Sequence, residues 1–291
     1  MATIKYSDLP TGSAIAGADL ISVNQSGVTV TSTATSMSTF IDVTALSVLA
    51  PHMNLKADLS TAGASLTFTA DQLTLGLSLT GRTVVISSFN QTNNLSTTGA
   101  GGKDTGTMTS PGYVAVYAIY NPSTLAVSTL ATTATSALAP TIYGGANMPS
   151  GYTYSRLISV WALSANNTYQ IGYQKGKQIW IPEVPFSFDF ATGASWSNTL
   201  ISSAVPINAK KYSARVIQLT QSNNLVYFTL SGVGAAIGSQ TMTSYVDTQS
   251  SSFEFTATDV PIFTAQRTFV NVPGIFNFVS GGGFVIASYT I

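Results

Sequence analysis

Apolar and polar residues alternate with a period of two along much of this chain. Clear examples lie at Ser65–Thr69 and Leu73–Leu79, and Val28–Thr33 adds an almost unbroken run of β-branched residues. Such alternation predicts β-strands that bury one face. Helical periodicity is weak, and in Ala126–Ala139 the threonine content makes a loop or an edge strand as good an interpretation as a helix. We therefore expect an all-β chain.

Further short strands follow, separated by turns and loops. They are expected at 83–87, 113–120, 157–163, 168–174, 178–181, 186–190, 211–220, 224–230, 240–246, 252–258, 268–272, 274–280 and 284–291. The segments 157–163 and 168–174 should pair as a hairpin, and Gln91–Gly106 should form a loop. Many short strands without helices between them are typical of β-sandwiches and jelly rolls.

The chain divides into three predicted regions. An N-terminal module covers residues 1–59, and two β-sandwich (jelly-roll-like) domains cover 60–181 and 182–291, with Pro182 and Pro185 marking a linker. Only four aromatic residues lie in the first 110 positions. Because aromatic side chains supply much of the area in a core, we expect the larger cores in the two later domains.

The N-terminal module reads as a hairpin followed by one helix. Its strands are expected at 18–23 and 28–33, and the helix at Thr39–Leu49, capped by Ser36 or Ser38 and ended by Pro51. A two-stranded hairpin with one helix is too small to be stable alone. Its surplus apolar residues are therefore candidates for attachment to another protein: Leu20, Ile21, Val23, Val28 and Val30.

Composition excludes several function classes. The chain has 11 Lys+Arg and 11 Asp+Glu, so that charged residues make up 8% against about a quarter in an average domain. Neutral charge without a basic cluster argues against nucleic acid as a partner. The absence of cysteine excludes disulfides and thiolate metal sites. No apolar run reaches the length of a membrane span, and residues 1–8 do not begin a secretory signal.

The residues that could carry catalysis are few. His52, the single histidine, follows Pro51 and is expected at the surface or at a subunit interface. The only glutamates are Glu183 and Glu254; alternation turns Glu254 and Asp189 towards solvent, and a hidden carboxylate pair remains the alternative. We expect no catalytic residue, no metal site and no cofactor.

Two features have both a binding and a structural interpretation. The glycine-rich segment 98–106 could contact an anion or a sugar through free N–H groups, or could be a flexible loop between strands. A set of nine aromatic residues could form a carbohydrate-stacking platform, although strand alternation favours the core for most of them: Trp161, Trp180, Trp196, Tyr113, Tyr117, Tyr152, Tyr154, Tyr169 and Tyr173.

The N-terminus resembles the opening of bacteriophage tail-fibre and virion appendage proteins. The matching residues are Ile4–Pro10 (IKYSDLP) and Asp19–Thr31 (DLISVNQSGVTVT), and segments within 102–122 and 148–154 resemble β-domains of phage structural proteins. The resemblance implies that the N-terminal module attaches the appendage to the particle and that the β-domains assemble as trimers. The chain lacks the long repetitive shaft of a full fibre.

These observations favour a structural protein of a virion, tail-fibre-like and not an enzyme. The expected partners are two further copies of the chain, as a homotrimer, and other virion proteins of the tail, baseplate or head. A surface with so few charges is poorly suited to a lone monomer. The alternatives are a head fibre or decoration protein, or a receptor-binding protein that holds host surface glycan through the last domain. A polysaccharide-degrading enzyme has the least support because carboxylates are scarce.

Overall fold

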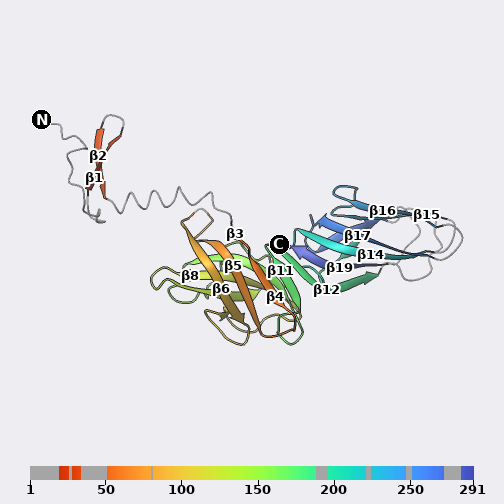
Figure 1. Ribbon diagram of the computed structural model, residues 1–291, viewed down its shortest axis with the longest axis horizontal. Helices are drawn as coiled ribbons and strands as arrows, with labels where there is room; N and C mark the ends of the chain where they lie inside the picture. Colours follow the sequence, from red (N-terminus) through yellow and green to blue (C-terminus); the bar gives the residue numbers. More distant parts are fainter. Residues whose placement is uncertain are drawn as a thin grey trace.

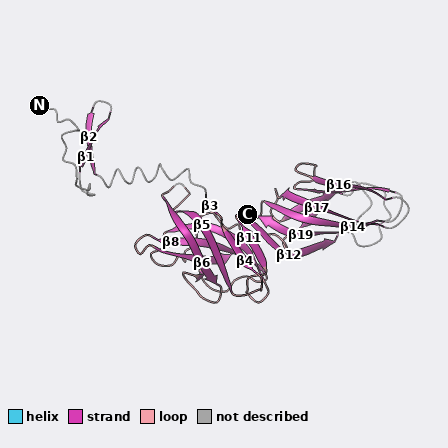
Figure 2. Ribbon diagram, viewed as in Figure 1, coloured by secondary structure: helices cyan, strands magenta, loops and turns pink. Residues whose placement is uncertain are grey.

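The computed structural model describes residues 20–25, 28–33, 51–79, 81–187, 196–220, 224–246, 251–271 and 283–291. Its regular structure in these residues consists of strands, without a helix (Figure 2), which confirms the all-β expectation for this part of the chain. No described helix is therefore long and apolar enough to cross a membrane. The helix expected at Thr39–Leu49 and the strand expected at 274–280 lie outside the described residues.

The N-terminal strands form a hairpin. β1 (Leu20–Gln25) and β2 (Val28–Thr33) pair antiparallel, with Val23 opposite Val30. Among the described strands, neither pairs with any other.

A first body of the fold follows the hairpin in sequence (Figure 1). Its strands are β3 (His52–Met53), β4 (Lys56–Leu59), β5 (Ser65–Gly76), β6 (Thr83–Asn94), β7 (Gly102–Lys103), β8 (Gly112–Asn121), β9 (Ala126–Thr133), β10 (Tyr154–Leu163), β11 (Gly172–Lys175) and β12 (Gln178–Ser187). One edge of β5 pairs with β6, while β4, β3 and β10 pair in turn along its other edge. Strand β10 also pairs with β8, and β8 pairs with β9. Trp161 of β10 packs edge-on against Phe68 of β5 at 6.5 Å between ring centroids.

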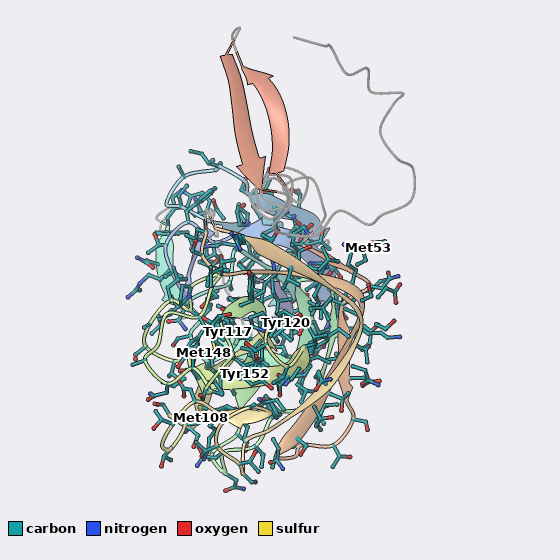
Figure 3. All side chains as sticks on the ribbon, turned by 90° about the vertical axis from the view of Figure 1, so that its left-hand side faces the viewer. Met53, Met108, Tyr117, Tyr120, Met148 and Tyr152 are labelled. Atoms are coloured by element: carbon teal, nitrogen blue, oxygen red, sulfur yellow. The ribbon has the colours of Figure 1, made fainter. Side chains whose placement is uncertain are left out.

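Strand β8 lies between β10 and β9 in the sheet, and a separate core packs against each of its faces. Its apolar run is nearly continuous, as expected for a strand covered on both sides. Val114 and Val116 enter the main core, whereas Tyr113 and Tyr117 enter a smaller core covered by residues 134–148. Figure 3 shows Tyr117 close to Met148 and Tyr152 on this side of the body.

A second body is built from the later strands. They are β13 (Ser197–Leu200), β14 (Lys211–Thr220), β15 (Asn224–Ser231), β16 (Gln240–Val246), β17 (Ser251–Pro261), β18 (Arg267–Asn271) and β19 (Gly283–Thr290). The sheet β13-β18-β15-β16 faces the strands β17-β14-β19-β12. The hydroxyl groups of Tyr212 and Thr268 lie 2.6 Å apart across the two layers, and the apolar side chains around them belong to the same core as the first body.

Strand β12 joins the two bodies. Its beginning pairs with both β11 and β19, and its end pairs with β19 alone. The linker expected at Pro182 and Pro185 is therefore wrong, since both prolines lie within a strand. The strand tolerates them because the pairing with β19 shifts register between Trp180 and Val184, and proline is accommodated at irregular or edge positions of a sheet.

The bodies are also joined by side chains. The Tyr289 hydroxyl group of β19 donates to the carbonyl oxygen of Val160 at 2.7 Å. The Asn208 side chain bonds both the N–H and the carbonyl group of Ala139. Strand pairing thus continues across both predicted domain boundaries, because β3 and β4 also pair with β5.

Three further expectations differ from the structure. The two strands expected at 65–69 and 73–79 are one strand, β5, because pairing with β6 continues through Ala70. The loop expected at Gln91–Gly106 begins as part of β6. The hairpin expected between 157–163 and 168–174 is limited to a single bridge from Leu163 to Tyr169, because β10 pairs with β8, whereas β11 pairs with β4 and β12.

Candidate functional site

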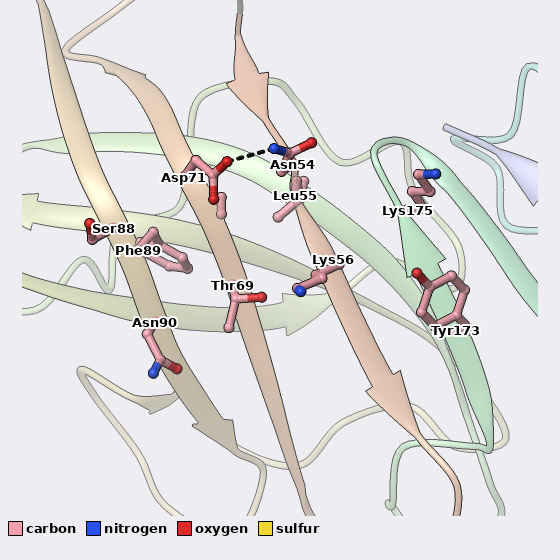
Figure 4. Close-up of a pocket in the computed structure, with 11 residues that line it drawn as sticks. Asn54, Leu55, Lys56, Thr69, Asp71, Ser88, Phe89, Asn90, Tyr173 and Lys175 are labelled. Carbon is pink, nitrogen blue, oxygen red and sulfur yellow. Dashed lines mark hydrogen bonds between the residues drawn. The ribbon is translucent and has the colours of Figure 1, made fainter.

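A groove of about 690 Å³ lies on the outer face of the sheet formed by β11, β4, β5 and β6 (Figure 4). Most of its lining residues are polar. The lining residues are Asn54, Leu55, Lys56, Thr69, Ala70, Asp71, Ser88, Phe89, Asn90, Tyr173 and Lys175. Four strands that are separate in sequence therefore contribute to one open surface.

Strand alternation explains the polar character of the groove. In β5, Phe68 and Ala70 point into the core, while Thr69 and Asp71 point outward. Residues directly opposite one another on paired strands share a face, and the register places Lys175, Lys56, Thr69 and Asn90 in one row. The row crosses all four strands, so the polar side chains follow one another at about 4.8 Å, the spacing of strands in a sheet.

The backbone is distorted around Asp71, at one end of the groove. Its neighbours across the sheet, Asn54 and Ser88, both have positive φ angles, of 51° and 53°. The Asn54 amide group donates to the Asp71 carboxylate at 2.5 Å (Figure 4). Non-glycine residues in this conformation cost about 1–3 kcal/mol each and cluster at functional sites. Leu55 and Phe89 also belong to the lining, although their side chains are buried in the main core.

An aromatic pair borders the groove. Tyr173 of β11 lies opposite Trp180 of β12, with 5.6 Å between ring centroids and 40° between ring planes. The two residues are 39% and 37% exposed. Of the nine aromatic residues considered for a stacking platform, the core interpretation is confirmed for those that are fully buried: Trp161, Tyr113, Tyr117 and Tyr169. Tyr173 and Trp180 are the exposed exceptions.

The glycine-rich segment 98–106 is a compact turn. The N–H groups of Gly99 and Gly102 donate within the segment, and those of Gly101 and Asp104 donate to carbonyl groups of β9. The anion-binding interpretation required free N–H groups, and those of Gly99, Gly101, Gly102 and Asp104 are engaged. Hydrogen bonds to β9 tie the segment to the sheet.

Glu183 and Glu254 meet at one arginine. The Arg215 guanidinium group donates to both Glu183 oxygens, at 3.1 and 2.6 Å, and to Glu254 at 2.8 Å. Both carboxylates lie at the surface, as expected for Glu254. Asp189 lies outside the described residues. A carboxylate pair bridged by a guanidinium group serves to cross-link β12, β14 and β17, and offers no unoccupied acid–base pair.

His52 lies half-buried in β3. Burial lowers its pKa below 6.5, and Lys177 and Arg156 lower it further. The residue is therefore neutral at physiological pH, and its charged neighbours are cations rather than the carboxylate that a catalytic histidine needs. The described residues also hold no group of three or more His, Asp or Glu side chains that could bind a metal ion.

The predicted attachment residues lie in the β1–β2 hairpin. Every second cross-strand pair of a hairpin belongs to one alternate set, whose side chains share a face. The register pairs Val23 with Val30, and the neighbouring pairs of that alternate set contain Ile21 and Val28. Leu20 pairs with Thr33 and belongs to the other set. Four of the five residues therefore share one set of cross-strand positions.

The groove residues Lys56, Asp71 and Asn90 were missed by the sequence reasoning. Outward positions in an alternating strand were the available signal for Asp71, but many surface residues share that signal. Tyr173 and Trp180 were named, without anything to separate them from the buried aromatic residues. The chain matches no family model, no curated protein and no solved structure.

Proposed function

We propose that this chain is a structural subunit of a bacteriophage virion appendage, tail-fibre-like and docked to the particle through residues 1–59. The observation that carries the proposal is the β1–β2 hairpin, which pairs with no other described strand. Isolated two-stranded hairpins are marginally stable in water, so the hairpin needs a partner. The resemblance of residues 4–10 and 19–31 to virion appendage proteins supports another virion protein as this partner.

The remaining observations are consistent with a structural role. The all-β architecture, the scarcity of charge and the engagement of both glutamates by Arg215 suit a protein that assembles rather than one that catalyses. Within this proposal, the two bodies act as two sandwich-like domains, and residues 39–49 form a helix of the docking module.

Deletion of residues 1–50 tests the docking role. We expect the shortened protein to fold and to be missing from purified particles. Ile21→Asp with Val28→Asp should have the same effect, because an unpaired charge in an interface costs far more than a lost contact, whereas each apolar side chain there contributes about 1.5–3 kcal/mol. Occupancy is measured by quantitative immunoblotting of purified particles.

A matched control places the same charges at neighbouring positions. Ser22 and Thr29 belong to the other alternate set and do not stand directly opposite one another, so Ser22→Asp with Thr29→Asp should leave particle occupancy unchanged. Full occupancy by the protein that lacks residues 1–50 would show that attachment lies elsewhere.

We also propose that the chain assembles as a homotrimer. Light scattering of the purified protein at micromolar concentration should give three times the mass of one chain, 30.3 kDa. The physical reason is the sparsely charged surface, since few charges leave identical copies with little mutual repulsion. A monomer at this concentration would contradict the proposal.

A further inference from the structure

We propose that the groove on β11, β4, β5 and β6 binds a neutral oligosaccharide, with Tyr173 and Trp180 as its stacking platform. The inference does not rest on the proposed virion role. It rests on three properties of the groove: the hydrogen-bonding groups along it, the balance of its charges and the aromatic pair beside it.

The hydrogen-bonding groups match a ligand rich in hydroxyls. A sugar hydroxyl group both donates and accepts, so it is best met by a surface that offers both functions. Lysine ammonium groups supply donors, the Asp71 carboxylate supplies acceptors, and Asn90 and Thr69 supply both. Lys175, Lys56, Thr69 and Asn90 stand in one continuous row across the strands, with Asp71 to one side of it, which suits an extended chain of sugar units better than a compact small molecule.

The charges on the outer face around the groove balance. Lys56 and Lys175 lie on the lining, Asp71 lies with them, and Asp58 stands opposite Tyr173 on the same outer face. A polyanion such as a nucleic acid requires an excess of cations, and a cationic ligand requires an excess of carboxylates. Two lysines and two aspartates on one face favour an uncharged ligand.

The aromatic pair supplies the apolar part of the site. One face of a pyranose ring presents C–H groups, which pack on aromatic rings, while the ring hydroxyls point to the sides. Tyr173 and Trp180 keep more than a third of their surface exposed. Aromatic side chains contribute a large buried area when a ligand covers them, so this exposed surface is available for a sugar ring. Asp58 stands beside Tyr173, within reach of the hydroxyls of a stacked ring.

The pre-formed shape of the groove supports the same conclusion. Two residues beside Asp71 hold positive φ angles, and the strands around them are paired on both sides of this point. Polar groups held at fixed positions in a pre-formed cleft are typical of a small-ligand site. The hydrogen bond from Asn54 holds Asp71 in place before any ligand arrives.

The test uses the full chain and an immobilised panel of oligosaccharides. The panel contains neutral glucans, mannans and galactans of several sugar units, uronate-containing and sialylated glycans, and heparin as a polyanion. We expect binding to at least one neutral class, and at least a tenfold loss of affinity in Tyr173→Ala with Trp180→Ala. Asn90→Ala should weaken binding to the same glycan, without touching the aromatic pair.

Phe263→Ala is the matched control, because Phe263 is 61% exposed and lies in the second body, away from the groove. It should bind as the unmodified chain does. Circular dichroism and light scattering show whether each variant keeps its fold and its oligomeric state.

Four results would overturn the proposal. They are binding to no member of the panel, binding only to acidic members, an equal loss in Phe263→Ala, and a change of oligomeric state in the Tyr173, Trp180 variant, which would identify the face as a subunit interface. These results are distinguishable from a failure of the docking proposal, which concerns the presence of the chain on particles.

Discussion

Above about pH 10, the protein should unfold cooperatively. Burial raises the pKa of five tyrosines well above the ordinary value of 10, and each is at most 4% exposed: Tyr113, Tyr117, Tyr169, Tyr212 and Tyr289. Burial and a hydrogen bond to Asp104 raise the pKa of Tyr143 to about 12. These groups therefore stay protonated in the folded protein at a pH where the unfolded chain releases its protons.

The direction of the effect follows from this difference. Below pH 10, both states hold the tyrosine protons and stability is independent of these groups. Between pH 10 and the raised pKa values, the unfolded state binds fewer protons, so stability falls as pH rises. Each tyrosine removes about 1.4 kcal/mol per pH unit, and the five fully buried residues together remove roughly 7 kcal/mol per unit, against a typical stability of about 5–15 kcal/mol.

The measurement is an alkaline titration that follows tyrosinate absorbance and circular dichroism together. We expect the buried tyrosines to ionise in the same transition that removes the β-sheet signal. Tyr113→Phe is the control, because it removes one titrating group and should make the pH dependence shallower by one proton. Ionisation of all 13 tyrosines near pH 10 in a protein that keeps its sheet signal would contradict the prediction.

Asn93→Leu should destabilise the first body by about 2–5 kcal/mol. Asn93 lies fully buried in β6. Its amide group donates to the carbonyl oxygen of Gly102 at 3.0 Å and to the Thr129 hydroxyl at 3.2 Å, and its oxygen accepts from the Tyr169 hydroxyl at 2.7 Å. Leucine has a similar shape and leaves the buried groups of Gly102 and Tyr169 without these partners.

Urea denaturation of the variant, of Tyr169→Phe and of the double variant measures this network. The loss in the double variant should be smaller than the sum of the two single losses, because both variants break the same bond. Asn90→Leu, on the exposed side of the same strand, should change stability by no more than about 0.5 kcal/mol. An equal loss in Asn90→Leu would show that strand propensity, and not the buried network, is responsible.

Many strands could be located from the sequence because their signal is local. The bounds expected for 28–33, 211–220 and 240–246 are those of β2, β14 and β16. In each case the residue pattern identifies a strand, and a polar or glycine-containing turn identifies its end. The same local signal was insufficient for β3 and β4, which are too short to show alternation.

Pairing between strands could be predicted less well. The expected hairpin at 157–174 failed because β10 finds a longer partner in β8, and the competition between partners is not visible in either segment alone. The linker failed for a similar reason, since proline is compatible with an edge or an irregular part of a strand, and only the position of β19 makes residues 184–187 a strand.

The sequence by itself determined the class of this protein and its restricted chemistry. Alternation required strands, and the absence of cysteine, the single histidine and the two glutamates limited the catalytic groups available. Only the tertiary structure decided which surface residues stand together. Lys175, Lys56, Thr69 and Asn90 form one row because β11, β4, β5 and β6 pair in a particular register. The register is set by which face of each strand is buried in the core. That burial depends on the whole core and cannot be determined from a single segment.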